Sequence, residues 1–157
     1  LIGVISAGYG YIQDKLGKIQ KVDINKEDLG ISEEASESLT EYRNIALFGV
    51  DSRNHNLEKG NRSDCIIIAS INNNTKEVKL ISVYRDTYVQ IQGHGLDKIT
   101  HAYSYGSAQL ALNTLNTNLD LNISEFATVN FDVVADAVDE LGGIDKHRIT
   151  TRNEIFE

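Results

Sequence analysis

Hydrophobic residues along this chain fall into short runs, and most of these runs begin or end at charged residues. Three such runs occupy residues 45–50, 65–71 and 78–83. All are too short for a typical helix and rich in β-branched residues, which predicts three strands. The short turn at 72–74 makes the second and third strands antiparallel partners. This pairing predicts that Asp64, before the second strand, and Arg85, after the third, are neighbours.

The second half of the chain changes to helical spacing. Between residues 99 and 121, four leucines fall largely on one face of a predicted helix: Leu110, Leu112, Leu115 and Leu119. Residues 126–131 predict another strand, and residues 133–141 predict an amphipathic helix that ends at a pair of glycines. Alternating strands and helices predict an α/β sandwich, with a central mixed sheet flanked by helices. Cys65 lies inside an apolar strand and is predicted to be a small core residue.

Charged residues gather where the predicted strands end or begin: Asp51 and Arg53, then Arg62 and Asp64, then Arg85 and Asp86. If the first strand ends at the same rim of the sheet, Asp51 lies beside Asp64. Neighbouring carboxylates repel each other unless a cation separates them, and oxygen ligands without thiolate or imidazole favour Mg²⁺ or Mn²⁺. Arginine forks bind phosphate oxygens in pairs, so the group predicts a pyrophosphate site. The alternative is a set of ordinary surface ion pairs, and the residue pattern leaves both interpretations open.

Composition narrows the class of protein. A chain of 157 residues with 41% apolar content can bury one core. Its 23 acidic and 15 basic residues give a net charge of -8, which argues against general binding of nucleic acid. The histidines at 55, 94, 101 and 147 lack metal-ligand spacing and are predicted to lie in loops or on helix surfaces.

Six short segments between about Asn44 and Asp145 resemble the LytR-CpsA-Psr family, which attaches cell-wall glycopolymers to peptidoglycan in mostly Gram-positive bacteria. They are 48–53 (Phe-Gly-Val-Asp-Ser-Arg), 62–64 (Arg-Ser-Asp), 82–87 (Ser-Val-Tyr-Arg-Asp-Thr), 96–103 (Leu-Asp-Lys-Ile-Thr-His-Ala-Tyr), 129–131 (Val-Asn-Phe) and 141–145 (Leu-Gly-Gly-Ile-Asp). All six occur in the family's order. The one departure within them is Tyr84, where the family usually has proline.

The resemblance implies a phosphotransferase that moves a glycopolymer phosphate, such as teichoic acid or capsule, from an undecaprenyl diphosphate carrier to a peptidoglycan hydroxyl. It implies that Asp51 and Asp64 hold Mg²⁺ or Mn²⁺ and that Arg62 and Arg85 grip the pyrophosphate. Three further residues complete the predicted site: Arg53, Asp86 and Lys98. Arg53 adds a phosphate contact. Asp86 either orients Arg85 or helps to deprotonate the acceptor, and Lys98 either contacts phosphate or is solvated.

The resemblance also divides the chain. Residues 1–14 are either the end of an N-terminal membrane anchor or a core strand or helix, and residues 15–42 form a polar stalk or exposed helix. Residues 43–145 carry the catalytic domain, and residues 146–157 form a divergent tail where the family continues with further strands and helices. The anchor interpretation implies a single-pass protein of the cell membrane with an extracellular catalytic domain. Some of the leucines of the 99–121 helix either pack in the core or face the polyprenyl chain.

Three functions therefore remain open from the sequence. The first is the Mg²⁺-dependent glycopolymer transferase. The second is a C-terminally incomplete, non-catalytic module that binds polyprenyl phosphate. The third is a metal-dependent pyrophosphatase, because the same residues can pass the phosphate to water.

Overall fold

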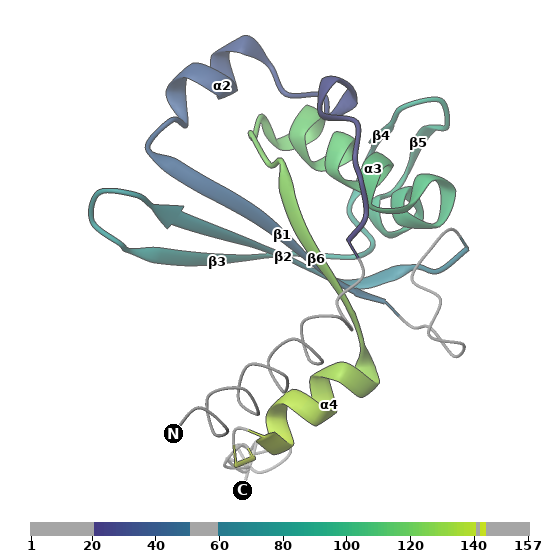
Figure 1. Ribbon diagram of the computed structural model, residues 1–157. Helices are drawn as coiled ribbons and strands as arrows, with labels where there is room; N and C mark the ends of the chain where they lie inside the picture. The colour runs from purple at the N-terminus through teal and green to yellow at the C-terminus, as the bar shows by residue number, and fades with distance from the viewer. Residues whose placement is uncertain (1–20, 51–59, 141, 144–157) are drawn as a thin grey trace, which may run out of the picture.

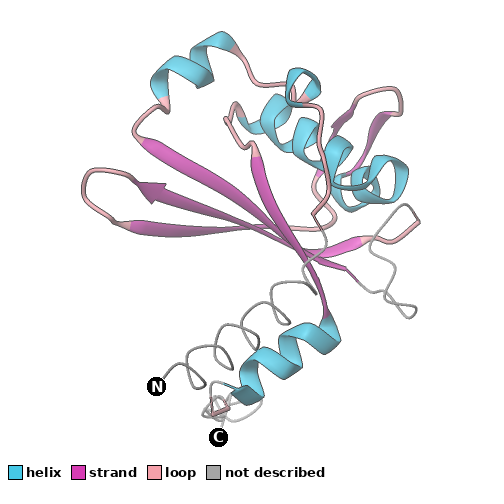
Figure 2. Cartoon of the chain, in the orientation of Figure 1, coloured by secondary structure: helices cyan, strands magenta, loops and turns pink. Residues whose placement is uncertain are grey.

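The computed structural model describes residues 21–50, 60–140 and 142–143. In chain order its elements are a 3₁₀ helix η1 (Lys26–Asp28), α2 (Glu33–Ser38), β1 (Tyr42–Val50), β2 (Ser63–Asn72), β3 (Val78–Val83), β4 (Tyr88–Ile91), β5 (Gly95–Lys98), α3 (Ile99–Leu119), β6 (Glu125–Asn130) and α4 (Phe131–Glu140). Helices α2 and α3 lie on one side of the fanned sheet, and α4 extends away from the end of β6 (Figures 1 and 2).

The main sheet is mixed, as the sequence predicts. Its four strands lie in the order β3-β2-β1-β6. Strand β2 is antiparallel to both β1 and β3, whereas β1 and β6 are parallel. The antiparallel pairing predicted across the 72–74 turn is confirmed. A second, two-stranded antiparallel sheet of β4 and β5 was not predicted.

Strand ends converge at one rim of the main sheet. Val50, the last residue of β1, pairs with Ser63 at the start of β2. Near the end of β3, Val83 pairs with Ile66 of β2. The parallel strand β6 also ends here, because Asn130 aligns with Val50. The end of β1 therefore lies at the same rim as the start of β2, which is the condition under which the sequence places Asp51 beside Asp64. Asp51 itself lies outside the described residues.

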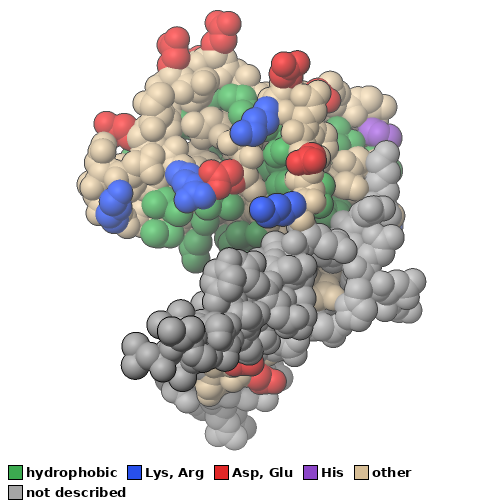
Figure 3. Space-filling model, in the orientation of Figure 1, with side chains coloured by type: hydrophobic (Ala, Val, Ile, Leu, Met, Phe, Trp, Pro, Cys, Tyr) green, Lys and Arg blue, Asp and Glu red, His purple; other side chains and the backbone are tan. Residues whose placement is uncertain are grey.

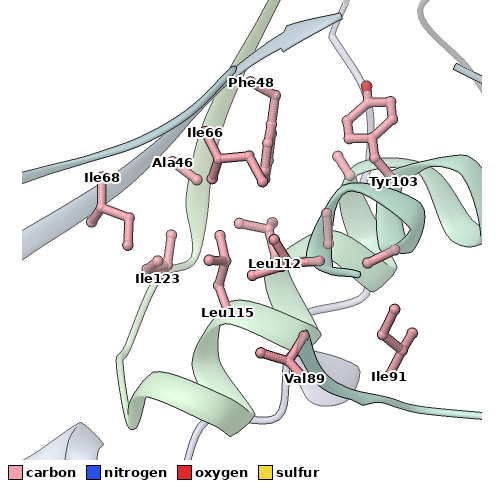
Figure 4. Close-up of a cluster of buried hydrophobic side chains, with 14 of the residues drawn as sticks. Ala46, Phe48, Ile66, Ile68, Val89, Ile91, Tyr103, Leu112, Leu115 and Ile123 are labelled. Atoms are coloured by element: carbon pink, nitrogen blue, oxygen red, sulfur yellow. The ribbon is translucent and has the colours of Figure 1, made fainter. Parts of the chain in front are cut away.

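The core fills the space between one face of the sheet and α3. Every second residue of β1 faces inward, so Ala46, Phe48 and Val50 are buried. Figure 4 shows Phe48 and Ile66 opposite Tyr103, Leu112 and Leu115 of α3. The rings of Phe48 and Tyr103 are tilted against each other, with their centroids 5.4 Å apart. Aromatic pairs prefer a tilted arrangement to a face-to-face one because of the charge distribution of the rings.

Helix α3 is kinked rather than continuous. Gly106 and Ser107 have non-helical backbone angles, and Ser107 has a positive φ of 55°. A Cβ atom at Gly106 would lie 2.4 Å from Cβ of Leu110, so the kink requires glycine here. Of the four leucines predicted to share a face, Leu112 and Leu115 are buried, Leu110 is partly buried, and Leu119 is 42% exposed.

The prediction that Cys65 is a core residue is wrong. Its thiol side chain is exposed, because Ile66 and Ile68 face inward and Cys65, one position before Ile66, points to the opposite face. A continuous apolar run hides this alternation from the sequence. The edge strand β3 is also uncovered over much of its length, with Val78, Leu80 and Ile81 exposed. Exposed hydrophobic side chains follow the lower side of the described part of the molecule in Figure 3.

The described part of the predicted stalk, from residue 21 onward, contains η1 and α2. Most of its side chains are exposed, but Leu29 and Ala35 are buried, and Leu29 belongs to the main core. Gln109 of α3 donates to the backbone carbonyls of Asn25 and Asp28, at 3.0 Å in each case. These contacts tie the segment to the domain. Across the described ranges, no helix combines the length and the apolar content that a membrane span requires.

Candidate phosphate and metal site

Four charged side chains of alternating sign form a row at the rim: Asp64, Arg85, Asp86 and Lys98. Arg85 Nη1 lies 2.7 Å from Asp64 Oδ1, and Lys98 Nζ lies 2.7 Å from Asp86 Oδ1. The contact within the row from Arg85 Nε to Asp86 Oδ2 is longer, at 4.0 Å. The predicted proximity of Asp64 and Arg85 is thus confirmed. Side chains from β2, from the turn after β3 and from the end of β5 meet here although the sequence separates them.

Hydrogen bonds fix the start of α3 against the turn after β3 and against the start of β2. The amide of Ile99 donates to the carbonyl of Thr87 at 2.8 Å, and the amide of Thr100 donates to that of Arg85 at 3.2 Å. The Thr100 hydroxyl donates to the carbonyl of Ser63 at 3.1 Å. Two of the free amides of the first helical turn are therefore used by the protein itself. These two amides are therefore not available to a ligand phosphate.

Two buried oxygen atoms at the start of β2 lack hydrogen bonds. Ser63 Oγ and Asp64 Oδ1 have no hydrogen-bond partner among the described residues. The close Arg85 contact to Asp64 is therefore an ion pair without hydrogen-bond alignment. Because buried oxygens are normally paired, these two have capacity for a hard cation that prefers oxygen ligands. Asp64 fits the predicted role of a Mg²⁺ or Mn²⁺ ligand.

The described residues supply only part of the predicted metal and phosphate site. Within residues 21–50, 60–140 and 142–143, no three Asp, Glu, His or Cys side chains gather closely enough to hold a metal ion. The other predicted ligand, Asp51, and the predicted phosphate contact Arg53 lie outside these ranges. Arg62 is exposed and makes no ion pair within the described part of the chain.

Asp86 is held mainly by Lys98. The hydrogen bond from Lys98 lowers the pKa of Asp86, and electrostatic interactions with Lys98, Arg85 and His101 act in the same direction. A carboxylate stabilised in this way is a weak proton acceptor. Lys98, which the sequence offers as a phosphate contact or a solvated lysine, is half exposed and engaged with Asp86.

A second polar cluster lies at the start of α3 and was not predicted. His101 Nδ1 lies 2.8 Å from Asp97 Oδ2, and the Tyr105 hydroxyl donates to the same oxygen at 2.8 Å. The amide of Lys98 donates to the other oxygen, Asp97 Oδ1, at 2.7 Å. On its far side Tyr105 stacks on His94, with ring centroids 4.1 Å apart. The spacing of 97, 101 and 105 is the sequence signal that could have revealed the cluster.

Helix α3 also contacts residues 60–62, the segment that leads into β2. The amide of Gly60 donates to the carbonyl of Ser104 at 3.1 Å, which ties this segment to α3. The hydrogen bond to Asp97 raises the pKa of Tyr105, and the charge of Arg62 opposes this rise. Asp97, by contrast, accepts from His101, Tyr105 and the Lys98 amide, and its pKa falls from the ordinary 3.8 to about 2.

This lowered pKa predicts how Asp97 contributes to stability as pH changes. The native state favours the ionised carboxylate, so the contribution is present above about pH 4 and is lost as pH falls towards about 2. We expect Asp97→Asn to lower the urea midpoint of unfolding at pH 7 and to match the wild type more closely at pH 2. Asp23→Asn, at an exposed aspartate, serves as the control. An Asp97→Asn deficit that is equal at both pH values would contradict the linkage.

Sequence comparison shows which known proteins this chain resembles. Residues 8–155 match the model of the LytR_cpsA_psr family. The chain is 34% identical over 154 residues to TagU of Bacillus cereus, a polyisoprenyl-teichoic acid–peptidoglycan teichoic acid transferase, and the match covers 92% of this chain and 50% of TagU. TagT of Bacillus subtilis, with the same activity in its name, is 36% identical over 112 residues, covering 70% of this chain and 34% of TagT.

Solved structures agree with the sequence match. A structure of TagT bound to LI-WTA superposes with a TM-score of 0.61 at 31% identity, covering 81% of this chain and 42% of TagT. A structure of TagT with bound octaprenyl pyrophosphate lipid gives a TM-score of 0.59 at 31% identity, covering 81% of this chain and 44% of that one. The chain spans between about a third and one half of the length of these relatives.

Proposed function

The chain belongs to the LytR-CpsA-Psr family, and from this membership we propose that it takes part in a phosphotransfer reaction of cell-wall assembly. The donor is an anionic glycopolymer, such as teichoic acid or capsule, linked to undecaprenyl diphosphate, and the acceptor is a hydroxyl of peptidoglycan. The names of the TagU and TagT relatives and the octaprenyl pyrophosphate bound by TagT support both substrate classes.

The ion pair between Arg85 and Asp64 is the single observation that carries this proposal. It puts a guanidinium and a carboxylate 2.7 Å apart at the rim, where β2 begins and β3 has just ended. Phosphoryl transfer needs positioning and neutralisation of charge more than a protein nucleophile. The Arg85 fork can bind two phosphate oxygens, and Arg62 and Arg53 are the further proposed phosphate contacts. Lys98, linked to Asp86, adds positive charge beside them.

We propose Mg²⁺, or Mn²⁺, as the metal, held by Asp64 together with Asp51. When bound, it would neutralise charge on the phosphate oxygens and favour in-line displacement. The buried Oδ1 of Asp64, which has no hydrogen-bond partner among the described residues besides its ion pair with Arg85, supports this role. Asp64 would release Arg85 in part when it turns to the metal, which leaves the guanidinium available to the diphosphate. Asp86 holds Lys98 and lies within reach of the Arg85 charge, which favours orientation over proton transfer as its role.

The family also supports a proposal on location. We place the catalytic domain outside the cell membrane of a Gram-positive bacterium, with a single N-terminal anchor. The apolar residues 1–12 are compatible with the end of such an anchor. Peptidoglycan and the lipid-linked polymer would both be accessible there.

The decisive assay follows transfer of a labelled glycopolymer from a polyprenyl diphosphate to peptidoglycan, with and without Mg²⁺, using the full-length protein. We expect metal-stimulated transfer that requires the acceptor. Release of the polymer at an equal rate without peptidoglycan would instead identify a pyrophosphatase. Metal-independent lipid binding with no turnover would identify a non-catalytic binding module.

Arg85→Lys tests the phosphate contact. Lysine keeps the charge but loses the planar fork, so we expect about tenfold weaker binding of a soluble polyprenyl diphosphate by calorimetry. Lys79→Arg is the matched control, because Lys79 is an exposed cation on β3 away from the rim. Equal affinity of Arg85→Lys and the wild type would rule out bidentate contact by Arg85.

A further inference from the structure

In the cluster of Asp97, His101 and Tyr105, His101 contributes an imidazole ring with two nitrogen atoms, Nδ1 and Nε2. Its Nδ1 is committed to Asp97 at 2.8 Å. The carboxylate also accepts from Tyr105 and from the Lys98 amide, and its low pKa keeps it ionised at every working pH. An ionised carboxylate can only accept at Nδ1, so this nitrogen carries the proton. In the neutral ring Nε2 then carries the lone pair, and no hydrogen bond to Nε2 is made within the described ranges.

This ring lies beside the row of charges. His101 is three residues after Lys98, whose ammonium binds Asp86, and one residue after Thr100, whose amide binds the carbonyl of Arg85. Asp86 also lies within electrostatic range of His101, which acts to lower the pKa of Asp86. On the other side, Tyr105 lies within electrostatic range of Arg62. The cluster is therefore joined through the backbone of Thr100 to Arg85 and lies within electrostatic range of Arg62, the two arginines proposed to hold the diphosphate.

We infer that His101 Nε2 is the proton acceptor for the incoming hydroxyl in the transfer reaction, with Asp97 as its positioning residue. This inference rests on the proposed function. The acceptor oxygen attacks the phosphorus that carries the polymer while its proton passes to Nε2. The new O–P bond forms as the bridging P–O bond of the diphosphate breaks, and polyprenyl phosphate leaves with the electron pair. The imidazolium, stabilised by Asp97, then returns its proton to water.

Two comparisons at the same rim favour His101 in this role. Asp86 is the other candidate base, but Lys98 lowers its pKa and occupies one of its oxygens at 2.7 Å. His94 has the same ring, but it stacks on Tyr105 and has no carboxylate contact among the described residues. Of the two histidines that the structure describes, His101 alone combines an oriented imidazole with a place beside the charged row. The charged and titratable groups around it are Asp97, Tyr105, Asp86, Lys98, Arg85 and Arg62.

The test uses His101→Asn in the full-length protein. The Asn amide can still donate to Asp97 in place of Nδ1, but it offers no base in place of Nε2. We expect about a 100-fold lower kcat for transfer, with little change in KM for the lipid substrate. The wild-type rate should rise with pH across the range in which imidazoles titrate, about pH 5 to 8, and the variant should lack this rise. His94→Asn is the matched control and should keep both the rate and the pH profile.

Chemical rescue separates proton transfer from a structural role. The cavity variant His101→Gly should recover part of its rate when imidazole is added, and His94→Gly should not respond. A His101→Asn rate and pH profile equal to the wild type would overturn the inference, as would a slow variant that keeps the rise with pH and ignores imidazole. If the Asn variant does not fold by circular dichroism, His101→Gln replaces it. A wild type without transfer would overturn the proposed function as well, whereas an active wild type confines any failure to His101.

Discussion

Replacing Asp64 with alanine should remove most metal-dependent turnover, lowering kcat by about a thousandfold or more. The substitution deletes the only predicted metal ligand that the structure describes, and it also removes the 2.7 Å partner of Arg85. Arg85 would then be free to move, so the diphosphate loses both a neutralising cation and a fixed guanidinium. The measurement is the transfer rate over a Mg²⁺ titration. We expect the variant rate to stay near the metal-free wild-type rate at every Mg²⁺ concentration.

A control at the other end of the β2–β3 hairpin distinguishes the effect of losing Asp64 from the effect of losing any one negative charge. Glu77 is an exposed carboxylate before β3, and its nearest cation, Lys79, is 3.9 Å away. Glu77→Ala should leave the rate and the Mg²⁺ dependence unchanged, since exposed pairs of this kind contribute little. If Asp64→Ala retains Mg²⁺-stimulated turnover, Asp64 does not hold the metal. Family membership would be unaffected by that result.

The rim was predictable because hairpin geometry leaves few alternatives. A short turn between two apolar runs forces antiparallel pairing, so the start of β2 and the end of β3 must meet. Asp64 and Arg85 flank those runs and are therefore close for any register near the observed one. The parallel pairing of β1 with β6 does not follow from local signals. It depends on the long connection through α3.

Short strands and individual side-chain contacts could not be predicted from the sequence. The β4 and β5 strands have only four residues each, too few for a clear alternation, and glycine and histidine in their turn indicate only a loop. The link from Asp97 through His101 to Tyr105 depends on which way each ring turns at the start of α3. The contact between Lys98 and Asp86 could not be predicted either, because nothing in the sequence shows that these two side chains meet. Cys65 shows that a continuous apolar run conceals which face of a strand is covered.

The largest expected effect on stability comes from Asn116, which joins three segments inside the core. It is 1% exposed, and its amide nitrogen donates to the carbonyls of Leu29 and Ile123, at 2.9 Å in each case. Its Oδ1 accepts from the amide of Ile123 at 2.8 Å. Asn116→Ala leaves these backbone groups buried without partners, at about 1–3 kcal/mol each. We expect the free energy of unfolding to fall by about 4 kcal/mol, measured by urea denaturation.

The exposed Asn74, in the turn between β2 and β3, provides the same substitution without burial. Asn74→Ala should change the free energy of unfolding by no more than about 0.5 kcal/mol. Asn116→Asp refines the interpretation, because it keeps the acceptor for the Ile123 amide but loses both donated hydrogen bonds and buries a charge. It should be at least as destabilising as alanine at pH 7. A loss below about 1 kcal/mol for Asn116→Ala would mean that water replaces the side chain, and that the 21–41 segment is held to α3 by other contacts such as Gln109.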